Sequence, residues 1–489
     1  MADQNLTYAR ELLLRINNLT ISGKSLADYF AYDTYSLWQC YQEAIFADLK
    51  VFSSTREVPQ KNSKGASLWR RWGSGCLIFM FSLPGMLSLF LRKPTIMFYT
   101  IDRADGAFLG DMRIGEVFRF LLEKKISFKE IIHSSNGATQ RTNFFKRGRA
   151  PLYYEALDFI YKLFSLVGAT KKSSLSFLEK IDYTSFKDDK ERAFIAFLLK
   201  KYAILRDVSV FKITWSSKLL TFVKPKALFL IDDGRQYYFE LLAAARNASV
   251  PSYAFQHGHI TKYQVGWQKL PLWQGPYLYP DHYMLWSEYW INELLRFNTY
   301  IPKEQMVIGG SKTALLPLVP HTNNEPLSVV IPYETIAPQS ELKPYLAALC
   351  NAPHISVTFK LRLDMSKEKQ CGQYGLVEVP GKVEAVTTLP LKEQEYDVVL
   401  GVYSSYLYDM IAFGVPVGLL ATSFDYGIGM VDNGLADMVR VEHLFDDITH
   451  LAALSDTERE RRRTVLFGAI PKQLYQTLEV LGREKYWYV

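Results

Sequence analysis

The sequence has few cysteines, and no pattern among them supports a disulfide framework or a zinc site. Its four cysteines are scattered over 489 residues without any Cys-x-x-Cys spacing, whereas such frameworks and sites need regularly spaced pairs. The N-terminus also lacks a charged segment followed by an apolar one, so no secretory signal is indicated. These absences predict a protein of a reducing compartment, which we expect to be the cytoplasm, while 48% apolar residues over this length predict a folded chain.

The chain also lacks a strong excess of charge and any signature of a nucleic-acid-binding module. Its net charge of +7 is mild for its length, and no zinc-finger or RNA-recognition pattern accompanies the basic residues. Basic residues nevertheless cluster beside an apolar run, with Arg70 and Arg71 before it and Arg92 and Lys93 after it. Such clusters can meet anionic lipid, so we expect a membrane surface rather than nucleic acid as a partner.

The apolar run itself is uncharged and covers residues 75–91. It is slightly shorter than the ~20 residues that a spanning helix needs, and Pro84-Gly85 interrupts it. We therefore expect a re-entrant or interface-lying apolar hairpin at the membrane. The alternative is a buried helical hairpin within the N-terminal part of the protein.

After this run, the pattern changes from mainly helical to alternating strands and helices. Expected strands are residues 95–101, 128–133, 227–231, 251–256, 283–286, 305–308, 327–331, 355–360, 398–400 and 417–420, and one expected helix is 189–205. Alternation of this kind predicts parallel sheets in doubly wound α/β domains. We expect a helical N-terminal appendage with the apolar hairpin (1–92), a first Rossmann-like domain (93–280), a second (281–455) and a C-terminal helix that crosses back (456–489).

Residues 396–420 predict a strand, a helix and a second strand joined by a parallel crossover. Ser404 and Ser405 fall at the expected helix N-terminus, where unpaired N–H groups and the helix dipole can hold a phosphate. Asp409 lies about one helical turn further on and can reach a ribose hydroxyl. The segment therefore predicts a nucleotide pocket; the alternative is that Ser404 only caps the helix.

Two neighbouring carboxylates stand at the carboxyl end of another expected strand. Asp232 and Asp233 follow an apolar run and precede Gly234 and Arg235, the place where a parallel sheet presents catalytic groups. A carboxylate there can act as a nucleophile or a base. The alternative for one of the two is a cap on the helix that begins near Gln236.

The next expected strand ends in Gln256, His257, Gly258 and His259. Because neighbouring parallel strands lie ~4.8 Å apart, these residues can approach Asp232 across one strand gap. Gly258 would let backbone approach a ligand closely. His257 is a candidate general acid or base, or a donor to a phosphate oxygen.

Two further strand ends carry groups suited to an anion. Gly310, Ser311 and Lys312 form a turn that can offer backbone N–H groups with a lysine beside them. Lys360 and Arg362 end another expected strand and can neutralise a phosphate or a carboxylate. For each of these sets, solvated edge charges are the alternative interpretation.

These motifs, in this order, resemble bacterial surface-carbohydrate glycosyltransferases of the GT-B fold. The resemblance covers roughly residues 220–435 and rests on short motifs: a Gln-His-Gly strand end, Leu-Trp-Ser-Glu, a Gly-Gly-Ser turn, Val-Ile-Pro-Tyr-Glu, a lysine-containing strand and Ser-Ser-x3-Asp. The Asp-Asp-Gly and Gln-His-Gly strand ends resemble retaining β-Kdo transferases, which use CMP-Kdo and an aspartate nucleophile. The His-Gly and Ser-Ser elements also resemble CDP-glycerol phosphotransferases of teichoic-acid synthesis.

The resemblance implies a GT-B-like α/β fold with two Rossmann-type domains that face a cleft. It implies that Asp232 is the nucleophile, that His257 lies beside the donor, and that Ser404, Ser405 and Asp409 contact the nucleotide. Asp233 remains a second catalytic candidate, as neighbour of Asp232. The remaining candidates for the cleft are the donor-side Gly310, Ser311, Lys312, Lys360 and Arg362, with Gln256, Gly258, His259 and Arg235 around them.

The expected activity is transfer of a sugar, with Kdo as the candidate, to a lipopolysaccharide, a capsule or another surface polysaccharide, or to its lipid-linked acceptor. We expect it at the cytoplasmic face of the inner membrane. No cofactor or metal is expected besides the nucleotide sugar, since helix dipoles and cations can carry the phosphate charge. One alternative is a CDP-glycerol or CDP-ribitol phosphotransferase, and another is a non-catalytic glycan-binding or scaffold protein. The phosphotransferases have a Lys-x-His-Pro motif, and this chain has Lys360-Leu-Arg362-Leu at the matching place.

Overall fold

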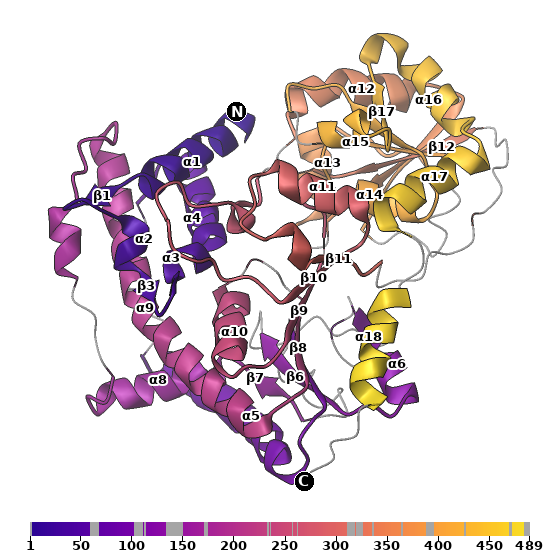
Figure 1. Ribbon diagram of the computed structural model, residues 1–489. Coiled ribbons are helices and arrows are strands. Elements are labelled where there is room, and N and C mark those ends of the chain that lie inside the picture. The colour runs from indigo at the N-terminus through magenta and orange to yellow at the C-terminus, as the bar shows by residue number, and fades with distance from the viewer. Residues whose placement is uncertain are drawn as a thin grey trace.

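The strands gather into two parallel sheets, each flanked by helices (Figure 1). The computed structural model describes residues 2–58, 68–101, 111, 114–133, 150–170, 175–231, 234, 236–256, 258–261, 263–310, 318, 326–334, 337–362, 365–387, 396–424, 427–468 and 472–483. Two Rossmann-type domains after a helical N-terminal segment confirm the fold class expected from the sequence.

The first sheet has seven parallel strands in the order β11-β10-β9-β8-β5-β6-β7. They are β5 (Ile96–Ile101), β6 (Phe128–His133), β7 (Leu152–Tyr153), β8 (Ala227–Leu230), β9 (Ser252–Phe255), β10 (His282–Leu285) and β11 (Met306–Ile308). The flanking helices are α6 (Gly115–Glu123), α8 (Ala156–Leu166), α9 (Asp189–Val223), α10 (Gln236–Asn247) and α11 (Glu288–Arg296). The strand order reverses between β5 and β8, so their carboxyl ends form a topological switch point, where α/β sheets bind ligands.

The second sheet has six parallel strands in the order β14-β13-β12-β15-β16-β17. They are β12 (Leu327–Pro332), β13 (Ile355–Lys360), β14 (Val383–Val386), β15 (Val398–Gly401), β16 (Val417–Leu420) and β17 (Asp437–Val439). The helices are α12 (Gln339–Asn351), α13 (Lys367–Tyr374), α14 (Ser405–Ala412), α15 (Ile428–Asp432) and α16 (Leu444–Ala452). Here the order reverses between β12 and β15, which gives this sheet its own switch point.

Two strands that the sequence analysis assigned to the second domain belong to the first sheet. Strand β10 pairs with β9, with Tyr283 opposite Ala254, and β11 pairs with β10, with Met306 opposite Tyr283. Alternation of strands and helices reveals the crossovers but not the sheet that each strand joins, because both sheets repeat the same unit. The chain passes to the second sheet only between β11 and β12.

The N-terminal segment packs against one side of the long helix α9. It contains α1 (Ala2–Asn17), α2 (Leu26–Tyr29), α3 (Leu37–Cys40) and α4 (Gln42–Thr55), and the hairpins β1 (Thr20–Ile21) with β2 (Lys24–Ser25) and β3 (Ala31–Tyr32) with β4 (Tyr35–Ser36). The rings of Phe52 and Phe194 stack at 4.2 Å, and the Tyr41 hydroxyl contacts Ser209 Oγ at 2.9 Å. Helix α9 extends beyond residue 205, where the sequence analysis expected it to end. The sequence did not reveal the continuation because its buried face there includes polar residues such as Ser209 and Lys212, which interrupt the apolar pattern.

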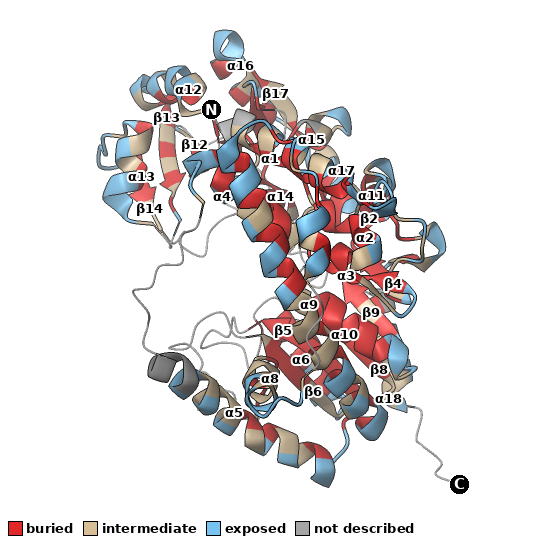
Figure 2. Ribbon diagram, turned by 90° about the vertical axis from the view of Figure 1, so that its left-hand side faces the viewer, coloured by how far each residue is buried: buried red, intermediate tan, exposed pale blue. Residues whose placement is uncertain are grey.

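The expected apolar hairpin is one continuous helix, α5 (Leu68–Leu91), which runs through Pro84 (Figure 2). A proline inside a helix removes one hydrogen bond, but α5 is held from outside by the strand beside it. Ser82 Oγ accepts a hydrogen bond from the N–H of Tyr153 in β7 (3.1 Å). Gly85 lies against the backbone of Pro151, where an added Cβ would come within 2.0 Å of the carbonyl oxygen.

Two helices follow the second sheet, α17 (Asp456–Phe467) and α18 (Lys472–Arg483). Helix α17 packs on α14 and α11. Helix α18 lies beside α6 of the first domain (Figure 1), and Leu474 and Leu478 join a buried cluster with Phe98 and Phe118. The C-terminal part of the chain therefore contacts both domains.

Gly85→Ala tests the close approach of α5 to the first sheet. The added methyl group meets the Pro151 backbone, so we expect a loss of about 1–3 kcal/mol in unfolding free energy, the usual cost of overpacking. Gly73→Ala is the matched control in the same helix, since nothing lies within 4 Å of its added Cβ; it should be neutral or stabilise by up to ~1 kcal/mol. Thermal unfolding midpoints compare the two variants, and equal midpoints would contradict this packing.

Candidate functional site

The switch point of the second sheet is occupied by the buried carboxylate of Glu334. This residue follows β12, and its side chain reaches the turn after β15. Glu334 Oε2 accepts a hydrogen bond from the N–H of Val402 (2.8 Å), and Oε1 accepts from the N–H groups of Tyr403 (2.7 Å) and Ser404 (2.5 Å). The Glu334 N–H donates to the Tyr374 hydroxyl (2.9 Å). The carboxylate therefore fixes the geometry of the turn that leads into α14.

The environment of Glu334 also changes its proton affinity. Glu334 is only 2% exposed. Burial raises the pKa of its carboxyl to about 7, although the hydrogen bonds from the three backbone N–H groups act to lower it. Between the ordinary pKa of a glutamate and about 7, the folded protein thus holds a proton that the unfolded chain releases.

The start of α14 places the two serines in different roles. Ser404 is the N-cap, and its Oγ accepts a hydrogen bond from the N–H of Tyr406 (3.2 Å), as in the alternative interpretation of the sequence. Ser405 is the first helical residue and is exposed. Asp409 is also exposed, four residues further on, and therefore lies on the same helix face as Ser405. A phosphate at this helix start would rely on Ser405 and nearby cations, because Glu334 and the cap already use the N–H groups of Ser404 and Tyr406.

Two cations stand next to this turn, at the carboxyl end of β13. Lys360 is the last residue of β13, and its Nζ lies 5.5 Å from the centroid of the Tyr406 ring. The backbone of Arg362 is held by the buried Gln370, whose Oε1 accepts from the Arg362 N–H (2.7 Å) and whose Nε2 donates to its carbonyl (2.9 Å). Burial raises the pKa of Tyr333 just after β12, and the positive charge of Arg362 opposes this shift.

At the first sheet, Gln256 has a structural role in the loop after β9. It is buried, its Oε1 accepts from the N–H of Trp286 (2.9 Å), and its Nε2 donates to the carbonyl of Gly258 (2.9 Å). An added Cβ at Gly258 would meet nothing within 4 Å, so space is open above this loop. Gln256 thus ties the loop to β10 and sets its course.

The two domains meet where this loop reaches α14. The ring of His259 stacks on that of Tyr408 at 5.0 Å and 11°, and the Trp290 ring of α11 lies 5.6 Å from the same tyrosine. The carbonyl of Leu466 in α17 accepts from Ser287 Oγ (3.1 Å) and Trp290 Nε1 (2.8 Å). The structure therefore brings His259 next to the helix that carries Ser405 and Asp409.

Other sequence candidates are separate from this junction or lie outside the described residues. Gly310 follows β11, the edge strand, which β10 and β9 separate from β8. Six candidates lie outside the described residues, namely Asp232, Asp233, Arg235, His257, Ser311 and Lys312. Their neighbour Gly234 is described, and an added Cβ there would lie 3.4 Å from Cγ of Glu43. Glu43 belongs to α4, so this helix of the N-terminal segment lies close to the carboxyl end of β8.

A polar cluster that the sequence analysis missed lies beside the same edge, and we define it as His133, Glu155, Tyr237, Lys212 and Asp158. His133 ends β6, its Nδ1 is paired with the Glu155 carboxylate, and its ring lies 4.7 Å from that of Tyr237. Lys212 Nζ lies 4.3 Å from the Tyr237 ring and 2.7 Å from an oxygen of Asp158. Burial lowers the pKa of Lys212, but the nearby carboxylates of Glu240 and Asp158 outweigh this effect and raise it, so the side chain is cationic.

The missed residues differ in how far the sequence could have revealed them. Glu334 is the first carboxylate after an apolar strand, which is the same signal that selected Asp232. Lys212 and Asp158 carry no such signal, because they lie inside helices. Among the residues that the structure describes, no group of three or more His, Cys, Asp or Glu side chains could hold a metal ion.

Comparison with known proteins gives general likenesses only. No protein-family model and no curated protein sequence matches the chain. Similar solved structures include a UDP-GlcNAc 2-epimerase from Neisseria meningitidis bound to UDP-GlcNAc (12% identity, TM-score 0.46, 79% of this chain and 98% of that one), the glycotransferase of kitacinnamycin (11%, 0.48, 80% and 99%), and the lipopolysaccharide outer core galactosyltransferase WaaB (10%, 0.41, 79% and 98%).

The raised pKa of Glu334 predicts a pH-dependent stability. A carboxyl whose pKa is higher in the folded state binds more protons when folded, so the unfolding free energy falls as pH rises from about 4.5 to about 7. The full shift corresponds to about 3 kcal/mol. Glu334→Gln removes this titration. The difference in melting temperature, wild type minus variant, should therefore fall as the pH rises through this window and become constant above about pH 8. A difference between the two that does not depend on pH would contradict the buried carboxyl.

Proposed function

We propose that this chain is a glycosyltransferase that passes a sugar from a nucleotide-sugar donor to a growing surface polysaccharide or its lipid-linked acceptor. The observation that carries the proposal is the contact of His259 with Tyr408, which joins the carboxyl edge of the first sheet to the helix that begins at the second. A transferase needs such a junction, because donor and acceptor must be held in contact for reaction.

On the donor side, the nucleotide phosphate would lie at the start of α14. Ser405 is exposed there, Lys360 at the end of β13 lies beside Tyr406, and Arg362 follows two residues after Lys360. The dipole of α14 and these two cations can neutralise the phosphate charge that develops as the sugar leaves. Asp409, on the same exposed face as Ser405, would meet the ribose. We therefore propose that transfer needs no bound metal.

On the acceptor side, we propose a retaining reaction in two steps with Asp232 as nucleophile. Its carboxylate forms a bond to the anomeric carbon while the bond from that carbon to the phosphate oxygen breaks, and the nucleotide leaves with the electron pair. An acceptor hydroxyl then attacks the same carbon, gives its proton to a base such as His257, and releases the carboxylate. In the sequence, Asp232 comes two residues after the end of β8, one of the two strands at the switch point of the first sheet, and this order supports the role.

The donor that we propose is CMP-Kdo. The proposal rests on the resemblance of the Asp-Asp-Gly and Gln-His-Gly strand ends to retaining β-Kdo transferases. A CDP-glycerol or CDP-ribitol phosphotransferase is the rival activity, and Arg362, in place of the histidine of that family, speaks against it. Transfer of radioactive glycerol phosphate rather than sugar would favour the rival.

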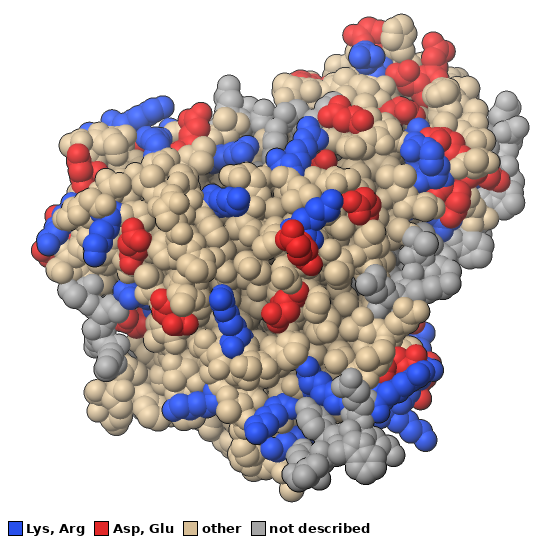
Figure 3. Space-filling model, viewed as in Figure 1, with Lys and Arg blue, Asp and Glu red and all other residues tan. Residues whose placement is uncertain are grey.

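We further propose that the protein works on the cytoplasmic face of the inner membrane, with α5 in contact with lipid. By length and composition, Gly73–Leu91 could cross a membrane, with a mean hydropathy of 1.9, and only 17% of this stretch is buried. Arg92 and Lys93 are exposed at its end. Figure 3 shows Lys and Arg side chains gathered over the lower part of the molecule, around the ends of α5 and α18. Such basic groups favour anionic lipid.

Asp232→Asn tests the proposed chemistry. The variant should lose transfer while it keeps nucleotide affinity, because a nucleophile contributes to the chemical step rather than to uniform binding. Wild-type protein given donor without acceptor should gain the mass of one sugar in intact mass spectrometry, and the variant should not.

Asp233→Asn is the control, since this residue is adjacent and has the same charge. It should retain much more activity than the Asp232 variant. If both variants transfer sugar equally well, or if only Asp233→Asn is inactive, the assignment of the nucleophile is wrong. If the wild type transfers no sugar from any nucleotide sugar, the glycosyltransferase proposal itself fails.

A further inference from the structure

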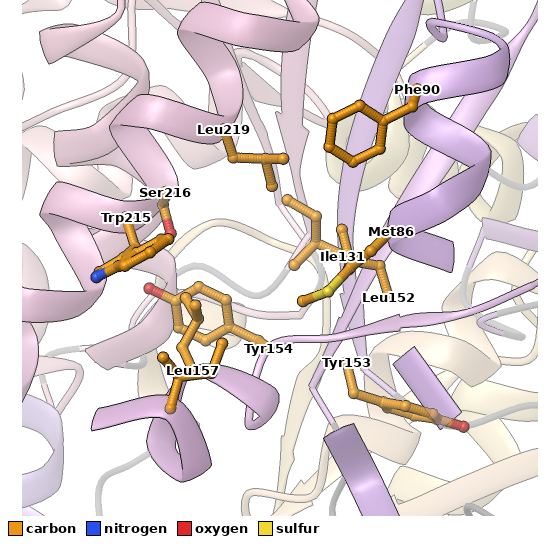
Figure 4. A pocket seen from close by; sticks show the side chains of 11 residues that line it. Met86, Phe90, Ile131, Leu152, Tyr153, Tyr154, Leu157, Trp215, Ser216 and Leu219 are labelled. Atoms are coloured by element: carbon orange, nitrogen blue, oxygen red, sulfur yellow. The ribbon is translucent and has the colours of Figure 1, made fainter. Parts of the chain in front are cut away.

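A cavity of about 250 Å³ lies in the first domain between α5, α8, α9 and the strands β6 and β7. Figure 4 shows side chains of α5, such as Met86 and Phe90, on one side and Trp215 and Leu219 of α9 on the other. Ile131 and Leu152 of the strands lie between them. Hydrocarbon groups thus form most of the wall, which favours an apolar occupant over water.

The cavity is closed at one end and reaches the surface at the other. Ile131 and Leu152 are each 2% exposed, whereas Phe90 and Trp215 are 68% and 36% exposed. The inner part is therefore shielded from water, and its mouth lies between α5 and α9. An apolar chain that entered here would exchange water for hydrocarbon over most of its inserted length.

The surface around the mouth is apolar as well. The ring of Phe90 lies 4.8 Å from that of Phe222, and the ring of Trp215 lies 5.9 Å from that of Phe164. These four rings define the apolar rim, and all four are exposed. Further exposed apolar side chains on α5 and at the end of α8 are Leu87, Leu91, Leu163, Leu166 and Val167. Exposed apolar patches of this kind mark contact with a membrane or a partner.

The inner end of the cavity adjoins the polar cluster at the carboxyl edge of the first sheet. Tyr154 lines the cavity, its ring lies 5.3 Å from that of Tyr237, and Lys212 Nζ lies 5.1 Å from it. Tyr237 is the second residue of α10, the helix that begins just after residues 232–235. The side chain of Tyr154 thus contacts the cavity on one side and the polar cluster on the other.

We propose that this cavity binds one aliphatic chain, that of the membrane lipid that carries the acceptor glycan. The identity of the lipid rests on the proposed function, whereas the chain itself follows from the cavity. Apolar cavities of ~150 Å³ hold benzene, and sites for drug-sized ligands begin at ~300 Å³, so the space fits a segment of one narrow chain. The apolar rim covers the part of the chain that leaves the cavity toward the bilayer, where Arg92 and Lys93 face anionic headgroups.

Titration with cis-parinaric acid, a fatty acid whose fluorescence rises in apolar surroundings, tests the cavity in the full-length protein. Leu219→Trp should fill the cavity from α9 and weaken binding about tenfold or more, since exclusion of even a few methylene groups has an effect of that size. Thr221→Trp is the matched control, because this exposed position of the same helix should leave binding unchanged. Met86→Trp fills the cavity from α5 and provides a second variant if the first does not fold.

Displacement of the probe by farnesyl phosphate and by palmitate distinguishes an isoprenoid lipid carrier from bulk lipid. Stronger displacement by farnesyl phosphate supports the acceptor lipid, while equal displacement assigns the cavity to bulk lipid and overturns that part of the proposal. Binding that neither filling variant weakens, or no binding to the wild type, overturns the cavity as a chain site. Because the titration needs neither donor nor acceptor glycan, its failure leaves the glycosyltransferase proposal standing, and failure of sugar transfer leaves the titration result standing.

Discussion

The carbonyl of Leu466, at the end of α17, fixes the relation between the two sheets. It accepts hydrogen bonds from Ser287 Oγ and Trp290 Nε1, which belong to the connection between β10 and β11 of the first sheet, while α17 itself packs on α14 of the second domain. The Phe467 ring stacks on Trp286 at 5.3 Å. A buried acceptor shared by two buried donors is costly to break, because each donor would lose its partner away from water. The site at the junction depends on this attachment.

With the domains held in this way, each sheet contributes a different kind of group to the junction. The second sheet has its switch point filled by Glu334, which holds a backbone turn in place, and the neighbouring Lys360 and Arg362 supply positive charge. The first sheet brings the loop that Gln256 positions after β9, while the polar cluster around Lys212 lies near the carboxyl end of β6. Rigid elements thus carry positive charges on one side and polar groups on the other, an arrangement that the proposed transfer would require.

The sequence predicted those parts that depend on local pattern. The buried strand before Ser404 and the cap that this serine provides follow from apolar runs and from N-cap preference. The sequence did not predict long-range contacts. The strand that contains Tyr283 belongs to the first sheet rather than the second, and α5 continues through Pro84 as one helix because β7 and Pro151 support it. Glu334 did carry a local signal, as the first carboxylate after an apolar strand, but its role depends on a turn that lies almost seventy residues away in the chain and could not be predicted.

The transfer that we propose requires the start of α14 to bind the phosphate of a nucleotide. Thermal-shift titration with CMP, CDP, UDP and GDP tests it most directly, because a ligand that binds only the folded state raises stability by about 2.7 kcal/mol at a hundred times its Kd. We predict that one of these nucleotides raises the melting temperature of the wild type, and that Ser405→Ala, which removes an exposed hydroxyl and no cap, reduces this shift without lowering the melting temperature of the free protein. If none of the four nucleotides shifts the melting temperature, or if the shift is unchanged in the variant, the start of α14 is not a nucleotide-phosphate site.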